Sequence, residues 1–111
     1  MSADFVGHTK RGCNLAGALK RFGRLDIIVN NAGYTWDSVI QKMTDEQWYA
    51  IMDCHLTAPF RILRAAQPVI RALSKSELDS GVRKVRKVVN ISSMAGVFGN
   101  VGQSNYSAAK A

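Results

Sequence analysis

The sequence predicts an α/β fold built on a parallel sheet, and two features carry this prediction. Two short apolar runs, Leu25–Asn30 and Val88–Ile91, have the length and composition of buried strands. Segments with helically spaced apolar residues precede the first run and separate it from the second. Buried strands that alternate with helices are typical of a doubly wound parallel sheet, with three α/β/α layers.

The first two helices are predicted from apolar spacing and from their end signals. Residues Asn14–Arg21 form the first, which we expect to end near Gly23, because glycine readily adopts a left-handed cap. The second begins after Thr44, which forms a capping-box pair with Gln47. Its apolar pattern continues to about Leu73.

The rest of the chain is predicted to hold two loops and one more helix. Residues 74–87 are polar, and residues 92–105 are small and flexible. The last helix begins near Gln103 or Ser104, and the sequence stops inside it at Ala111. Two strands are too few for a stable open sheet. We therefore expect the central part of a larger α/β domain, truncated at both ends.

Composition and charge exclude several classes of protein. A length of 111 residues allows one domain at most, so we assign residues 1–111 to a single domain. Hydrophobic residues make up 47% and charged residues 21%, which excludes long disorder, collagen and coiled coil. No apolar run approaches the roughly 20 residues that span a membrane, and no signal peptide is visible. Cys13 and Cys54 form no disulfide framework or metal motif, so we expect a cytoplasmic protein without a metal.

Tyr106 and Lys110 are four residues apart on the last predicted helix, which places them on one face. A neighbouring ammonium stabilises a phenolate. Such a pair can donate and accept a proton near neutral pH. Tyrosine and lysine at this spacing also occur in helices without catalysis, so the pair by itself leaves both interpretations open.

Two further motifs follow the two predicted strands. Ser92 and Ser93 come directly after the second strand, and residues 30–33 (Asn-Asn-Ala-Gly) end the first. Ligands of parallel α/β sheets bind beyond the carboxyl ends of the strands. The serines can donate hydrogen bonds to a substrate oxygen, and the small residues let a flat ligand approach the backbone. Each motif by itself also fits an ordinary turn.

Taken together and in order, these motifs resemble the classical short-chain dehydrogenases/reductases. The resemblance rests on Asp4, Asn-Asn-Ala-Gly at 30–33, Ile-Ser-Ser-Met-Ala-Gly at 91–96 and Tyr-Ser-Ala-Ala-Lys at 106–110. Residues 99–111 are particularly similar to the 3-oxoacyl-[acyl carrier protein] reductase branch. The resemblance implies a partial Rossmann-like fold.

The resemblance implies a role for each matching residue. Tyr106 would protonate the substrate carbonyl, Lys110 would stabilise its phenolate and hold the nicotinamide ribose, and Ser93 would hydrogen-bond the substrate oxygen. The cofactor would be NADP or NAD, since the residues that choose between them are absent from this sequence. The expected cofactor-binding residues are Asp4, Phe5, Asn30, Asn31, Ala32, Gly33, Tyr106 and Lys110.

His55 departs from the family pattern, because the family usually has asparagine there as a fourth catalytic residue. That asparagine supports a helix kink whose free carbonyl holds a relay water. Here Pro59 has no N–H to offer the carbonyl of residue 55, so the same carbonyl is expected to be free. The imidazole adds a group that can bond or titrate. We expect His55 to take part in catalysis; the alternative is a structural histidine.

The implied substrates are small carbonyl compounds or alcohols, with a 3-oxoacyl thioester of acyl carrier protein or coenzyme A favoured, as in fatty acid metabolism. The parent enzyme is expected to be a homotetramer or dimer. The glycine-rich phosphate motif of the family has no counterpart before Asp4. We therefore expect little or no activity from these residues alone.

The alternative function is a catalytically inactive short-chain dehydrogenase that serves as an oligomerisation or interaction module. The net charge is +7, and residues 71–87 are rich in Lys and Arg. These charges can steer anionic substrates. No interleaved aromatic residues accompany them, so nucleic acid is not an expected partner, nor is a membrane.

Overall fold

The computed structural model describes residues 15–111, which form two compact units. Among these residues, the first unit consists of residues 15–29 and Phe60–Val89, and the second of Asn30–Pro59 and Asn90–Ala111. The assignment of residues 1–111 to a single domain stays a prediction. No helix in the described part of the chain is long and apolar enough to cross a membrane.

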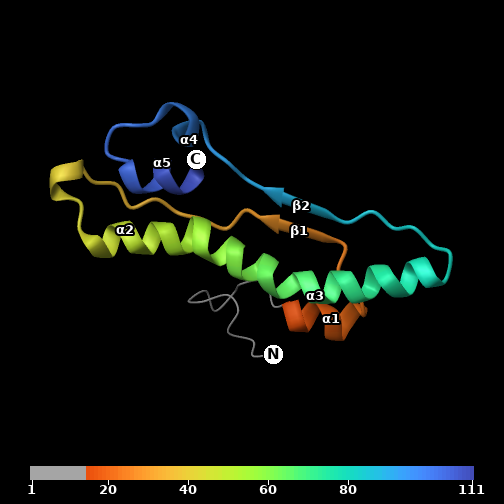
Figure 1. Ribbon diagram of the computed structural model, residues 1–111. Helices are drawn as coiled ribbons and strands as arrows, with labels where there is room; N and C mark the ends of the chain where they lie inside the picture. The colour runs from red at the N-terminus through yellow and green to blue at the C-terminus, as the bar shows by residue number, and fades with distance from the viewer. Residues whose placement is uncertain (1–14) are drawn as a thin grey trace. The chain divides into compact units, whose positions relative to one another are not determined.

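The first unit contains two strands and two helices. Strands β1 (Ile27–Asn30) and β2 (Lys87–Asn90) run side by side in a two-stranded sheet (Figure 1). The N–H of Lys87 bonds to the carbonyl of Asp26 at 2.9 Å, and the N–H of Ile91 to the carbonyl of Asn30 at 3.2 Å. Both partners advance by four residues in the same direction, so the strands are parallel, as predicted.

Helix α1 (Leu15–Phe22) ends where the sequence predicts. Gly23 has φ 67° and donates its N–H to the carbonyl of Leu19 at 2.8 Å. A positive φ at this position is easy for glycine, so the residue closes the helix without strain.

The core of the first unit lies between α1, α3 (Ala58–Asp79) and β1. Its buried members are Leu15, Leu25, Ile28, Ala65 and Ala66, bordered by Leu19, Ile62, Leu63 and Ile70.

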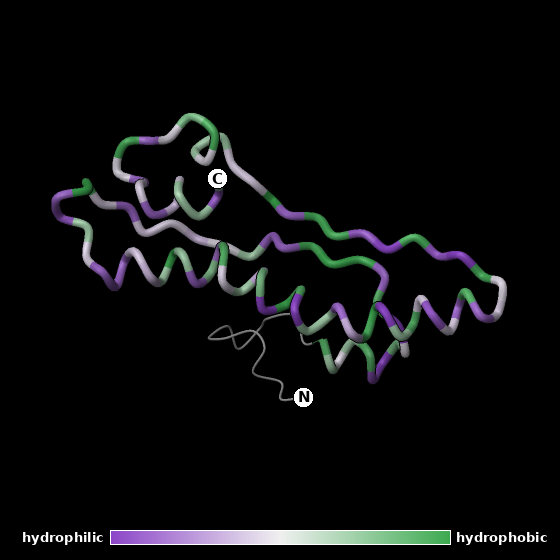
Figure 2. Tube along the Cα trace, in the orientation of Figure 1, coloured by the Kyte–Doolittle hydropathy of each residue, from purple (hydrophilic) through white to green (hydrophobic). Residues whose placement is uncertain are grey.

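The prediction of two buried strands is wrong for most of their residues. Ile28 is 7% exposed, but its neighbours Ile27 and Val29 are 60% and 56% exposed. All of β2 is exposed. Successive strand residues face opposite sides of a sheet, and within residues 15–111 helices cover only the side of Ile28. Figure 2 shows the hydrophobic residues that both strands carry.

The second unit contains most of the remaining helices: a 3₁₀ turn at Ile40–Lys42, α2 (Asp45–Met52), a π-helical turn at Asp53–Thr57, α4 (Met94–Phe98) and α5 (Ser104–Lys110). The predicted capping box is confirmed. The Gln47 N–H bonds to Oγ1 of Thr44 at 3.2 Å, and the Thr44 N–H bonds to Oε1 of Gln47 at 2.9 Å. The predicted start of the last helix is also confirmed.

Two predicted loops contain helix instead. Helix α3 continues to Asp79, six residues beyond the predicted end at Leu73, because Lys, Glu and Leu in this stretch favour helix. Residues 92–105 include α4, whose first turn is capped by Ser93. The alternating small residues of this segment gave no clear periodicity, so the short helix was not predictable from it.

The π-helical turn lies immediately before Pro59. The N–H of Ala58 reaches the carbonyl of Asp53, five residues back. The sequence predicts a local distortion here, since a proline N cannot continue the α-helical bonding pattern. π turns of this kind are frequent at functional sites. A free carbonyl at His55 remains a prediction.

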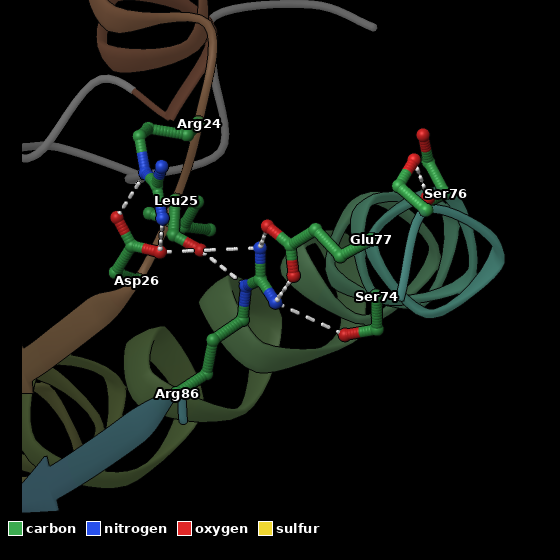
Figure 3. Close-up of polar contacts among 8 residues, drawn as sticks. Arg24, Leu25, Asp26, Ser74, Ser76, Glu77 and Arg86 are labelled. Atoms are coloured by element: carbon green, nitrogen blue, oxygen red, sulfur yellow. Dashed lines mark hydrogen bonds and ion pairs between the residues drawn. The ribbon is translucent and has the colours of Figure 1, made fainter. Parts of the chain in front are cut away.

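The segment before β2 is attached to α3 through Arg86 (Figure 3). The guanidinium bonds to both carboxylate oxygens of Glu77 at 2.8 Å, to Oγ of Ser74 at 3.1 Å and to the carbonyl of Leu25 at 2.8 Å. The Arg86 guanidinium holds the pKa of Glu77 below its ordinary value. The Arg24 guanidinium does the same to the pKa of Asp26.

We predict that Glu77→Gln lowers stability at neutral pH and flattens its acid dependence. A carboxyl with a depressed folded-state pKa stabilises the fold above its unfolded pKa of about 4.3, and this contribution is lost as pH falls through the lower, folded value. Urea unfolding between about pH 3 and 7 tests this. Asp79→Asn, at the exposed end of the same helix, is the control. The same acid dependence in wild type and Glu77→Gln would contradict the prediction.

Candidate active site

The predicted catalytic residues all lie in the second unit. Tyr106 and Lys110 lie on α5, and the Lys110 ammonium is 6.0 Å from the centre of the Tyr106 ring. The ammonium also donates to the carbonyl of Ile91 at 2.6 Å. One carbonyl leaves a lysine further N–H donors. Lys110 is therefore fixed beside Tyr106 and still able to bind another acceptor.

The last turn of α5 is fixed by the segment after β2. Oγ of Ser92 donates to the carbonyl of Lys110 at 2.9 Å. A Cβ on Gly96 would lie 2.6 Å from both atoms of the backbone carbonyl of Lys110. No side chain fits in that distance, so glycine is what lets α4 approach α5 this closely. Gly96 thereby contributes to the position of Lys110.

His55 lies against the ring of Tyr106. The two ring centres are 5.1 Å apart with an interplanar angle of 88°, an edge-to-face arrangement. Nε2 of His55 lies 2.7 Å from the carbonyl oxygen of Tyr34. Across its other side, a Cβ on Gly33 would overlap with Cε1 of the imidazole. The absence of a side chain at Gly33 therefore makes the place for this imidazole.

The imidazole of His55 bonds to the main chain of Tyr34 through Nε2. In the tautomer that carries its proton on Nε2, this nitrogen donates to the carbonyl of Tyr34 at 2.7 Å. The Tyr34 N–H is farther from the same nitrogen, at 3.3 Å. In the neutral ring Nδ1 then carries a lone pair. Nδ1 is buried, and no residue in the described part of the chain bonds to it. A buried acceptor of this kind can be satisfied by an internal water.

Ser93 lies in the same unit, at the start of α4. Its Oγ accepts the N–H of Ala95 at 3.2 Å and so caps α4. A capping hydroxyl still has its proton to donate. Within residues 15–111 no hydrogen bond joins Ser93 to Tyr106.

The residues predicted to bind the cofactor have different surroundings. Nδ2 of Asn30 donates to Oδ1 of Asn90 at 2.7 Å, which ties the strand ends together. Asn31 is exposed. The carbonyl of Ala32 lies 3.9 Å from Sγ of Cys54, a thiol whose pKa is raised by burial. Gly33 contacts His55. The predicted residues Asp4 and Phe5 lie outside the described residues.

The sequence analysis missed Asn105, which is completely buried and directly precedes Tyr106. Its Nδ2 lies 3.1 Å from the carbonyls of both Trp36 and Gln47, and its Oδ1 accepts the N–H of Tyr106 at 2.8 Å. Asparagine at the start of a helix is usually exposed, so burial was not expected. Its position beside the proposed catalytic tyrosine is the one signal in the sequence that points to it.

The polar groups of Tyr106, Lys110 and Asn31 fit the ribose groups of a nicotinamide dinucleotide. Tyr106 and Lys110 supply a hydroxyl and an ammonium, and the exposed amide of Asn31 follows the end of β1. Ribose hydroxyls both donate and accept hydrogen bonds, so they match these groups. No group of three or more His, Cys, Asp or Glu residues with metal-binding geometry is present among residues 15–111.

A Tyr–Lys pair on one helix of an α/β protein is suited to proton transfer at a nucleotide-bound substrate. The comparisons with known proteins identify the family. Residues 5–111 match the family model described as short chain dehydrogenase. The chain belongs to the short-chain dehydrogenase family.

Its similarity extends to several curated proteins. The chain is 42% identical over 93 residues to the peroxisomal hydratase-dehydrogenase-epimerase of Saccharomyces cerevisiae, covering 84% of this chain and 9% of that protein. It is 41% identical over 90 residues to the 3-oxoacyl-[acyl-carrier-protein] reductase FabG of Vibrio cholerae, covering 81% of this chain and 33% of that enzyme. The chain therefore spans a third or less of the length of these relatives.

A solved structure supports the fold. The crystal structure of a short chain dehydrogenase from Mycobacterium avium matches with a TM-score of 0.72 and 36% sequence identity, over 86% of this chain and 32% of that one. The predicted Rossmann-like α/β class is thereby confirmed.

We predict that the effects of Gly33→Ala and His55→Ala on the free energy of unfolding are coupled. The added methyl displaces the imidazole, and overpacking of this kind costs about 1–3 kcal/mol. In a His55→Ala background the three nearest atoms to the methyl, which all belong to the imidazole, are gone, so the same substitution costs much less. A double-mutant cycle from urea unfolding gives an expected interaction energy of at least about 1 kcal/mol. Additive effects of the two changes would show that His55 does not lie over Gly33.

Proposed function

We propose that this protein supplies the catalytic residues of an NAD(P)(H)-dependent oxidoreductase that interconverts a ketone and its secondary alcohol, with Tyr106 as the acid/base. The observation that carries the proposal is the surroundings of the Tyr106 ring. An ammonium lies 6.0 Å from its centre, and an imidazole meets it edge to face at 5.1 Å.

Tyr106 donates its phenolic proton to the carbonyl oxygen of the substrate, or accepts it back from the alcohol. Lys110 stabilises the phenolate by its positive charge, and its remaining N–H groups hold ribose hydroxyls. The nicotinamide supplies the hydride when it is bound. Ser93 donates its hydroxyl proton to the substrate oxygen, because its own oxygen is already engaged as a helix cap.

His55 extends the path of the proton. With Nε2 bound to the carbonyl of Tyr34, Nδ1 is a buried acceptor for an internal water. The proposed free carbonyl of His55 can hold the same water. The imidazole and the main chain thus perform together the role for which the family usually uses asparagine.

The remaining cofactor contacts are assigned to Asp4 and Phe5 at the adenine and to residues 30–33 at the adenosine ribose. Asn30 acts there chiefly by tying the strand ends, since its amide bonds to Asn90. The cofactor is NADP or NAD.

We propose a 3-oxoacyl thioester as the substrate class, presented by acyl carrier protein or coenzyme A. The support is the similarity to relatives named 3-oxoacyl-[acyl-carrier-protein] reductase, at 40–43% identity. The whole protein is proposed to be a cytoplasmic homotetramer or dimer.

The direct test is oxidation of NADPH or NADH with an acetoacetyl thioester, using the protein expressed from its full reading frame. Tyr106→Phe removes the proton donor and keeps the ring, so we predict that kcat falls about 10²- to 10⁴-fold. Tyr49→Phe, at a 68% exposed tyrosine of α2, leaves the rate unchanged. Turnover that survives Tyr106→Phe contradicts the proposal. A complete lack of turnover in the wild type favours the interaction module instead.

We also predict a graded response at His55. His55→Leu removes both ring nitrogens, so kcat falls about 10-fold or more, within the range for a lost proton-transfer group. His55→Asn retains an amide that can bond a water, and keeps more activity than the leucine variant. Steady-state rates over pH measure both. Equal rates for leucine and asparagine would remove the side chain from the mechanism.

A further inference from the structure

Asn105 has an unusual position for an uncharged polar side chain. It is 0% exposed, and a buried amide is costly unless its hydrogen bonds are made. Both its donors and one of its acceptor positions are used within the second unit. Two carbonyls, of Trp36 and Gln47, surround its nitrogen at 3.1 Å, so the orientation of the amide is fixed by its partners.

The partners come from three segments that the proposed active site needs. Trp36 follows the Asn-Asn-Ala-Gly segment by a few residues, and Gln47 lies on α2, which continues into the π-helical turn that carries His55. The third partner is the N–H of Tyr106 itself, at 2.8 Å. One amide thus joins the first turn of α5 to the two segments that position His55.

We infer that Asn105 is a positioning residue that sets the placement of the Tyr106 hydroxyl relative to His55. The inference rests on the proposed function of Tyr106. Another side-chain hydrogen bond at this end of α5 is on the surface: Gln103 donates to the carboxylate of Asp37 at 3.2 Å, and both side chains are accessible to water. Asn105 is the buried contact, so it limits the position of Tyr106 most strongly.

Two substitutions distinguish the hydrogen bonds of the amide nitrogen of Asn105 from the hydrogen bond of its oxygen. Asn105→Ala removes all three hydrogen bonds. Asn105→Ser keeps an oxygen near the N–H of Tyr106 but loses the bonds to Trp36 and Gln47. Asn100→Asp is the control, since Asn100 is exposed and, among the described residues, its side chain bonds only to the side chain of Gln103.

In folded Asn105→Ala we expect kcat to fall about 10- to 100-fold, since a displacement near 1 Å at a reacting group costs that much. KM values should change less than about twofold, and the pH profile of kcat should shift. A purely structural residue would lower stability without this split between kcat and KM. Asn100→Asp should leave kcat unchanged.

NMR provides a readout that does not depend on activity. The chain has two histidines, so the imidazole signals of His55 are readily assigned with a His55→Asn variant. Edge-to-face contact with Tyr106 shifts these signals by ring current. We expect the shift to be present in wild type and Asn100→Asp, and reduced in Asn105→Ala and Asn105→Ser.

The results test the positioning role of Asn105 separately from the proposed function of Tyr106. If Tyr106→Phe is inactive but Asn105→Ala folds and keeps the wild-type kcat and the wild-type ring-current shift, the positioning role is overturned and the proposed function is not. An active Tyr106→Phe overturns the proposed function. If Asn105→Ala does not fold, the serine variant is judged by the same criteria. Failure of both to fold makes Asn105 a general structural residue and also overturns the inference.

Discussion

The hydrogen bonds of one buried amide are the constraint on which the rest of the proposed site depends. Asn105 can be buried at this position only while two carbonyls accept from its nitrogen and the Tyr106 N–H donates to its oxygen. Displacing α5 would leave the amide nitrogen of Asn105 and the carbonyls of Trp36 and Gln47 unpaired, at a cost of about 1–3 kcal/mol for each. The position of Tyr106 follows from that penalty.

Two glycines also help to position the residues of the proposed site, because they leave space for neighbouring groups. Gly96 lets α4 meet the main chain of Lys110, and Gly33 makes the place for the imidazole of His55. Both contacts bring a segment that follows a strand up to a side chain or main chain of the proposed site. Small residues at the strand ends thus organise the proposed catalytic groups, in addition to any approach they allow to a ligand.

Local signals predicted much of the helical structure. The Gly23 cap, the Thr44–Gln47 capping box and the start of α5 depend on residues close in sequence, so each was predictable. The extension of α3 to Asp79 was missed, because its stretch is polar and Arg86 holds it from beyond the helix. The exposure of the strands was missed because burial depends on which elements cover a sheet.

In the candidate site, too, features that depend on local sequence were predictable and features that depend on tertiary contacts were not. Its residue types and their order were predictable from the motifs, whereas their contacts were not. Asn105 gave no signal of burial, and the place of Gly33 beneath His55 depends on two segments 22 residues apart that the π-helical turn brings together. Pro59 predicted the distortion of that helix, but the direction in which it turns His55 requires the structure.

The central claim is that this protein transfers hydrogen between a nicotinamide and a carbonyl carbon, with Tyr106 as proton donor. The most direct measurement uses reduced nicotinamide cofactor with deuterium at both C4 positions and an acetoacetyl thioester. The product formed by the protein from its full reading frame is analysed by mass spectrometry. The account predicts a hydroxyacyl product that carries the deuterium, and no such product from Tyr106→Phe. A product without deuterium, or one that forms equally without the Tyr106 hydroxyl, would contradict it.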